Sequence, residues 1–147
     1  MDWLVDPFGP GALDWTGHLE WAWLPLRLTV GYIMFDSGRG KWSRGISGTG
    51  EWFRSLGFPV PQALARFVAT VEVVGGALLF VGLFVHLAGA VIAMNMVAAA
   101  LTQKFKLRAP FQGGDVQGYE LDVLLVAAAL TLALGGAGPA SLDAVLW

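Results

Sequence analysis

Residues 73–103 read VVGGALLFVGLFVHLAGAVIAMNMVAAALTQ and contain no Lys, Arg, Asp or Glu. As one helix, residues 62–105 would measure about 66 Å, which is roughly twice the thickness of the hydrocarbon core of a bilayer. The chain must therefore fold back within this stretch, and Gly82 can end a helix because glycine adopts the left-handed conformation without strain. We predict two helices, over residues 61–84 and 86–105, joined by a tight turn.

Apolar segments on both sides of this stretch predict two more long helices. The first covers residues 20–38, close to the roughly 20 residues that cross a bilayer core, and the second covers residues 116–137. Between the first and second long helices, residues 51–56 predict a short amphipathic helix that lies in the membrane interface, with Thr49 as its N-cap. Ser141 is expected to cap a last short helical turn.

The composition of the whole chain agrees with a membrane location. Charged residues make up 14% of the 147 residues, whereas about 25% is usual in a soluble domain. We therefore predict an all-α membrane protein in which residues 1–147 form a single transmembrane domain. Its fold class is a four-transmembrane-helix bundle with a short interfacial helix between helices one and two.

Composition also excludes several classes of function. A formal net charge of −2 and a pI near 5.5 provide no basic footprint for nucleic acid. The absence of cysteine excludes disulfides, iron–sulfur clusters and thiolate zinc sites. With His18 and His86 as the two histidines, no residues stand at metal-ligand spacing, and there is no dinucleotide-binding loop. We expect no metal, haem or dinucleotide.

The basic residues predict the orientation of the chain. Four crossings place the connection after helix one and the connection after helix three on the same side of the membrane. All basic residues except Arg27 lie in or beside these connections: Arg39, Lys41, Arg44, Arg54, Arg66, Lys104, Lys106 and Arg108. The positive-inside rule makes this side cytoplasmic, so both termini are expected outside.

Two charged residues lie deep inside the predicted membrane helices, well below the headgroups. Arg27 lies about seven residues into helix one, and Glu72 lies about eleven residues into helix two. A central charge costs about 2.5–3.5 kcal/mol on insertion scales, so such residues usually face a partner or a wet cavity. Because the two helices are antiparallel, we predict that Arg27 and Glu72 pair near the midplane, where the amide of Asn95 in helix three can complete the site.

This predicted pair has two interpretations. It is either a buried brace that fixes the helix register or a site for a ligand or a proton. A second polar layer is expected nearer the cytoplasm, formed by Asp36, Arg39, Lys41, Arg66, Gln103, Glu120 and Asp122. Within this layer, Lys41 and Glu120 have two interpretations. Together they close the mouth of the same cavity. Alternatively, Lys41 extends to lipid phosphates, and Glu120 is an acidic residue of the kind favoured in the first turn of a helix.

The order of several short motifs is similar to that of a known family. The chain carries Leu26-Arg27-Leu28 with Gly31, Ser37-Gly38 to Lys41, Phe53 to Pro61, Glu72 with Gly75-Gly76, Gly82-Leu83, Tyr119-Glu120-Leu121 and Ser141-Leu142-Asp143. Together they resemble the DoxX family of small four-helix membrane proteins over about residues 26–146. The common His-Gly after helix one is Ser37-Gly38 here, which removes one proton donor and is closer to the DoxD-like branch.

The resemblance implies a function and a location. DoxD is the membrane subunit of a thiosulfate:quinone oxidoreductase, and other relatives are partners of oxidative-stress complexes. The leading hypothesis is a quinone-linked redox subunit in the cytoplasmic membrane of a bacterium or archaeon, surrounded by lipid and joined by other subunits or further copies of itself. Arg27 and Glu72 are then the candidate catalytic residues, and Lys41, Asn95 and Glu120 the candidate quinone-binding residues.

Two other hypotheses remain open at this point. The chain could be a non-enzymatic scaffold or assembly partner of a redox or stress-response complex, in which the buried charges provide specificity. It could also be a small-molecule or ion carrier, although four short helices offer little room for alternating access without oligomerisation.

Overall fold

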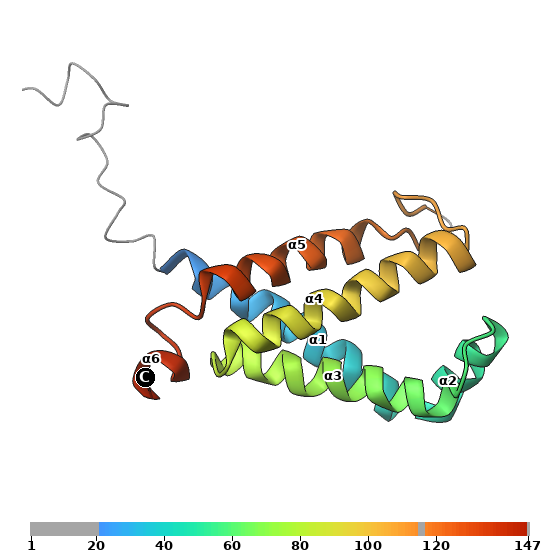
Figure 1. Cartoon of the computed structure of the whole chain (residues 1–147), viewed down its shortest axis with the longest axis horizontal. Helices are drawn as coiled ribbons and strands as arrows, with labels where there is room; N and C mark the ends of the chain where they lie inside the picture. The colour runs from blue at the N-terminus through green and yellow to red at the C-terminus, as the bar shows by residue number, and fades with distance from the viewer. Residues whose placement is uncertain (1–20, 115–116, 147) are drawn as a thin grey trace, which may run out of the picture.

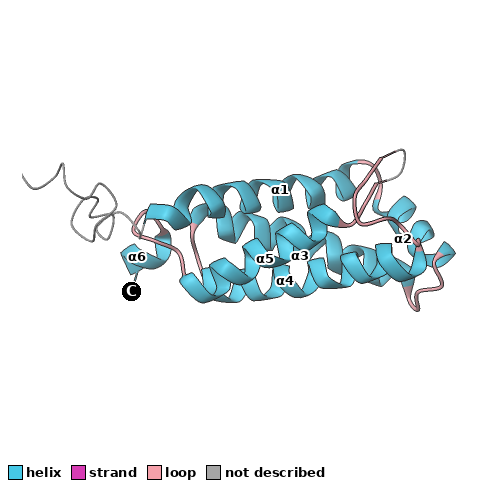
Figure 2. Cartoon of the chain, turned by 90° about the horizontal axis from the view of Figure 1, so that it is seen from above, coloured by secondary structure: helices cyan, strands magenta, loops and turns pink. Residues whose placement is uncertain are grey.

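The computed structural model describes residues 21–114 and 117–146, and the regular structure of these residues is entirely helical. The four long helices are α1 (Trp23–Ser43), α3 (Pro61–Val81), α4 (Val85–Leu101) and α5 (Glu120–Gly135). A π-helical turn, η3 (Thr102–Lys106), continues α4, and the short helices are α2 (Ile46–Ser55) and α6 (Leu142–Leu146). Figures 1 and 2 show the long helices side by side, with α2 at one end and α6 at the other.

The fold-back between α3 and α4 lies where the sequence predicts it. Gly82 ends α3 with φ of 74° and its N–H bonds to carbonyls of the last turn of α3. Phe84 is also left-handed, with φ of 50°, and α4 begins at the next residue. At the far end of the chain, the N–H of Ala144 bonds to Ser141 Oγ at 3.1 Å, which confirms the predicted cap of the last helix.

Other helix boundaries differ from the prediction. α1 continues to Ser43 instead of ending near residue 38, because its last turns pack against α3 and α2 and no longer need to end where the polar residues begin. α2 starts at Ile46 after Gly45, whose φ of 100° makes the turn before the helix, so Thr49 lies inside α2 and the predicted Thr49 cap is wrong. α5 begins at Glu120, four residues later than expected.

Backbone-to-backbone contact joins α1 to α3. A Cβ built on Gly31 would lie 2.7 Å from the backbone nitrogen of Phe80, and a Cβ on Gly38 would lie 2.7 Å from that of Val73. Real Cβ atoms do not approach so closely, so glycine is required at both positions. Since these contacts align residue 31 with residue 80 and residue 38 with residue 73, they fix the register of the two antiparallel helices.

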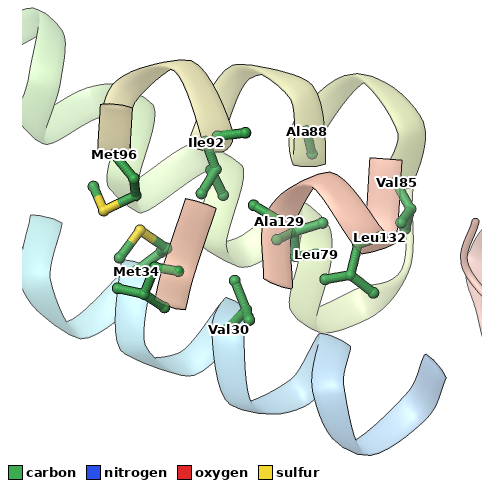
Figure 3. Packing of buried hydrophobic residues seen from close by; sticks show 11 residues of the cluster. Val30, Met34, Leu79, Val85, Ala88, Ile92, Met96, Ala129 and Leu132 are labelled. Atoms are coloured by element: carbon green, nitrogen blue, oxygen red, sulfur yellow. The ribbon is translucent and has the colours of Figure 1, made fainter. Parts of the chain in front are cut away.

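A similar contact joins α4 to α5. A Cβ on Gly89 would lie 2.8 Å from the carbonyl oxygen of Ala129. The molecule thus contains two closely packed helix pairs, α1 with α3 and α4 with α5. A shared core fills the space between them (Figure 3). Its buried side chains are Val30, Met34, Leu79, Val85, Ala88, Ile92, Ala93, Met96, Leu125, Ala129 and Leu132.

Two helices of the described chain are long and apolar enough to cross a membrane. They are Pro61–Val81, with 21 residues, and Val85–Lys106, with 22 residues, the second combining α4 and η3. The basic residues after helices one and three gather at the end that carries α2, and the described chain begins and finishes at the opposite end (Figure 1). Because the regular structure of the described residues is helical throughout, the predicted all-helical class is confirmed.

Candidate functional site

A partly buried ion pair joins α1 to α3. Lys41 Nζ lies 2.5 Å from Glu72 Oε2, and the two side chains are 22% and 4% exposed. The ammonium also donates a hydrogen bond to Ser37 Oγ at 3.0 Å, one helical turn earlier on α1. Lys41 is thus held by a carboxylate and a hydroxyl, and Glu72 reaches its partner across the interface of the helix pair.

Gly38 makes room for this ion pair. A Cβ at Gly38 would lie 2.8 Å from the Cβ of Glu72. The missing side chain lets the carboxylate pass along α1 toward Lys41, which lies three residues farther on. The same glycine that sets the helix register therefore also opens the route for the ion pair.

Asn95 of α4 extends the pair into a network of three helices. Its Nδ2 donates to Glu72 Oε1 at 3.4 Å, so each carboxylate oxygen of Glu72 has a different partner. We call Lys41, Glu72 and Asn95 the central network. The prediction that Asn95 lies beside Glu72 is confirmed.

A second polar contact lies between α5 and η3. Gln103 Nε2 donates to Asp122 Oδ2 at 2.6 Å, and Asp122 is 9% exposed. The charges of Lys41 and Glu72 are close enough to act on this carboxylate. The second polar layer expected from the sequence thus exists in part, through Lys41, Gln103 and Asp122.

The predicted pairing of Arg27 with Glu72 is wrong. The α1–α3 register places Glu72 beside Gly38, which is eleven residues or roughly 16 Å along α1 from Arg27. Depth measured from the expected helix ends places Arg27 and Glu72 at one level, whereas the glycine contacts shift the two helices relative to each other. Lys41, near the true end of α1, is the residue that Glu72 meets.

Arg27 is instead bound to the segment between α5 and α6. Its guanidinium donates to the carbonyl oxygens of Ala137 and Ala140, the latter at 2.5 Å, and the residue is 2% exposed. Its Nε has no hydrogen-bond partner among the described residues. Gly82 provides the space, since a Cβ there would lie 2.6 Å from the guanidinium.

Asp143 of α6 closes the same end of the molecule. Its carboxylate accepts the N–H groups of Phe84 and Val85 at 2.8 and 3.0 Å, which caps the start of α4. Its own N–H donates to the Gly82 carbonyl at 2.9 Å. A cavity of about 350 Å³ lies here, lined by Phe84, His86, Leu87, Ala137 and Asp143.

Glu120 does not belong to the central network. It is exposed and accepts the N–H of Gly113 at 3.3 Å, whereas Lys41 is bonded to Ser37 and Glu72. The structure therefore gives Lys41 and Glu120 separate partners, and the predicted shared cavity mouth is not observed. Of the five candidate residues, Lys41, Glu72 and Asn95 are brought together, while Arg27 and Glu120 lie elsewhere.

The central network can donate hydrogen bonds and exchange a proton inside an apolar molecule. Lys41 and Asn95 supply N–H donors, and Glu72 supplies a carboxylate. Met34 lies one turn before Gly38, and Met96 follows Asn95; both are buried and face each other in Figure 3. Polar donors beside apolar side chains are the usual lining of a site for an apolar ring with polar substituents.

Sequence reasoning missed three of these contacts. It did not assign Ser37 to Lys41, although their spacing of four residues places them on one helix face. The pairing of Gln103 with Asp122 and the capping of α4 by Asp143 join distant parts of the chain. No local pattern identifies such partners, because their proximity depends on helix register and on which helices are neighbours.

Comparison with known proteins gives a family match. The DoxX family model matches residues 22–104, which hold the whole central network. The chain is 37% identical over 120 residues to a protein of Bacillus subtilis (strain 168) called "Putative oxidoreductase CatD". That alignment covers 82% of this chain and 83% of the relative. No solved structure matched the chain significantly.

Proposed function

Because the chain belongs to the DoxX family, we propose that it is the membrane subunit of a quinone-linked oxidoreductase whose quinone site is the central network. The family and the two apolar helices indicate a membrane protein. The name of the Bacillus subtilis relative contains the word oxidoreductase, which supports redox chemistry. The finer assignment to a quinone is the step that we add.

The observation that carries this proposal is the placement of a buried carboxylate, Glu72, in contact with the partly buried side chains of Lys41 and Asn95 between helices of a membrane protein. Ionisable groups in such positions are costly and usually serve a ligand, an ion or a proton. A quinone carbonyl accepts hydrogen bonds, for which Lys41 Nζ and Asn95 Nδ2 are suitable donors. Met34 and Met96 offer apolar surface to the ring.

In this proposal all four long helices cross the membrane and α2 lies in the interface. α1 has 21 residues, which is enough to span a bilayer core, and α5 with 16 residues is near the lower limit. The basic end that carries α2 faces the cytoplasm, and both termini face outward. The membrane is the cytoplasmic membrane of a bacterium or archaeon.

The proposed reaction balances with a sulfur oxyanion as the reductant. Two thiosulfate ions form a new S–S bond to give tetrathionate and release two electrons. Quinone takes up two electrons and two protons to give the quinol. We assign thiosulfate binding to a partner subunit, whereas Glu72 exchanges protons at the quinone oxygen and Lys41 stabilises negative charge that develops there.

The test uses the purified protein with candidate partner subunits, thiosulfate and a soluble quinone, and follows the quinone absorbance. Glu72→Gln should abolish quinone reduction. Glu51→Gln is the matched control, because Glu51 is exposed on α2 and the substitution is the same. If the wild-type protein reduces no quinone with any candidate partner, the proposal is wrong.

A scaffold role is the second candidate, and one observation favours it. The polar groups of the central network bond to one another, as expected of a device that specifies helix register. As a scaffold, the chain would recruit partner subunits through its exposed basic end. Glu72→Gln would then reduce the yield of the assembled complex, and no quinone would co-purify with the wild-type protein.

A further inference from the structure

The buried polar groups near the α2 end contain more negative than positive charge. Lys41 contributes one ammonium, while Glu72 and Asp122 contribute two carboxylates that are 3% and 9% exposed as residues. Arg27, the cation that is buried among the described residues, is bound to carbonyls at the opposite end, and Lys41 is partly buried. Fully ionised, the three groups would therefore carry one uncompensated negative charge.

An uncompensated charge of this kind is costly in apolar surroundings. Transferring an isolated carboxylate from water into a protein interior is so unfavourable that the group usually takes up a proton instead. Within the described residues, no Lys or Arg nitrogen lies within 4 Å of Asp122. The three groups can therefore become neutral by binding one proton.

Asp122 is the better of the two carboxylates for this proton. Glu72 is in direct contact with the Lys41 ammonium and accepts a second hydrogen bond from Asn95, so both of its oxygens already have a donor. Asp122 receives one neutral amide donor, Gln103. The charge of Glu72 further disfavours a second negative charge at Asp122, and this opposes the attraction of Lys41.

Asp122 can also exchange its proton with solvent. Its Oδ1 has no hydrogen-bond partner among the described residues, yet it is not among the fully enclosed polar atoms. Asp122 is the third residue of α5, at the end of the molecule where the basic residues gather. The other acid in this turn, Glu120, is exposed and bonded to Gly113.

From this geometry we propose that Asp122 is the proton-storing residue of the buried polar groups, loaded from water at the α2 end. The carboxylate and one proton form the neutral acid, and release of that proton regenerates the anion. The use of this proton in quinone reduction rests on the proposed function. The binding of the proton by Asp122 does not.

Infrared difference spectroscopy of the purified protein tests this inference directly. A protonated carboxyl group gives a C=O stretching band that shifts when the solvent is changed to D₂O. The wild-type protein at neutral pH should show such a band, and Asp122→Asn should remove it. Asp36→Asn is the matched control, since Asp36 is an exposed acid on α1, and this variant should retain the band.

A second variant covers the case in which Asp122→Asn does not fold. Asp122→Glu keeps a carboxyl group in a changed position, so the frequency of the band should shift while its intensity remains. Absence of the band in the wild-type protein, its persistence in Asp122→Asn or an unchanged frequency in Asp122→Glu would each overturn the inference.

The quinone assay separates this inference from the proposed function. If the protein shows the Asp122 band but reduces no quinone, the inference about Asp122 stands and the proposed function is wrong. If the protein reduces quinone but shows no band, the proposed function stands and the inference about Asp122 is wrong.

Discussion

The two ends of the molecule bury a cation in different ways. Near the α2 end, Lys41 meets a carboxylate on a neighbouring helix, and a second buried carboxylate lies close by. At the α6 end, Arg27 meets two backbone carbonyls of the chain segment before α6. Carbonyl partners cannot gain or lose protons, so the Arg27 contacts act as a brace, whereas the charge around Lys41 can change.

The largest effect on stability is expected when one member of the ion pair is removed, and this change tests the difference between the two ends most directly. Lys41→Met should destabilise the protein by about 3–5 kcal/mol, because it leaves the Glu72 carboxylate buried without its partner, and Glu72→Met should cost less, because the Lys41 side chain that it leaves is 22% exposed. The combination of Lys41→Met with Glu72→Met should recover much of this loss. Unfolding in detergent measures all three variants, and a double variant no more stable than the worse single variant would contradict the pairing.

Removal of the cation at the other end should cost less. Arg27→Met leaves two carbonyls without donors, but Ala137 is partly exposed and Ala140 is exposed, so water can replace the guanidinium there, and the loss should stay within the roughly 1–3 kcal/mol of one unsatisfied buried group. The structure further predicts that Arg27→Met and Glu72→Met have additive effects on the free energy of unfolding, because the two sites do not touch. If the double variant were more stable than additivity predicts, the result would support a contact between Arg27 and Glu72, as the sequence predicts, and would contradict the structure.

Gly38→Ala tests whether the close helix contact supports the ion pair. The new Cβ would collide with the backbone of α3 and with the Glu72 side chain, and overpacking of this kind costs about 1–3 kcal/mol. Gly48→Ala is the matched control, since a Cβ there meets nothing within 4 Å. Equal thermal stability of the two variants would argue against the close contact.

The smallest effect is expected at the cap of α4. Asp143→Ala removes the acceptor of the Phe84 and Val85 N–H groups, and loss of an N-cap costs about 0.5–2 kcal/mol. This change should leave quinone reduction intact, because Asp143 lies at the opposite end from the central network. If Asp143→Ala lowered quinone reduction as well as stability, the two ends would be coupled.

Much of the fold could be predicted from the sequence because its main patterns are local. The uncharged run over residues 73–103 is too long for one crossing, and Gly82 is the residue that ends α3. Ser141 caps α6 as expected. The helix ends near residues 38 and 116 could not be placed, since they depend on packing and on the connecting loop rather than on local propensity.

The candidate site could be predicted only in its composition. The rarity of charge inside apolar helices identifies Glu72 as a residue that needs a partner, and the depth of Asn95 in the third long helix predicts that it lies near Glu72. The identity of its cationic partner depended on the register of α1 against α3. That register is set by Gly31 and Gly38 fitting against the α3 backbone, a contact that the sequence of either helix alone does not reveal.

The close glycine contacts within each helix pair also determine how the polar groups can separate. Because the backbones of α1 and α3 touch, these helices should move as one rigid body, and so should α4 and α5. Lys41 and Glu72 belong to the first body, whereas Asn95 and Asp122 belong to the second. A sliding or opening motion between the bodies would lengthen the 3.4 Å bond from Asn95 to Glu72 and leave the ion pair intact.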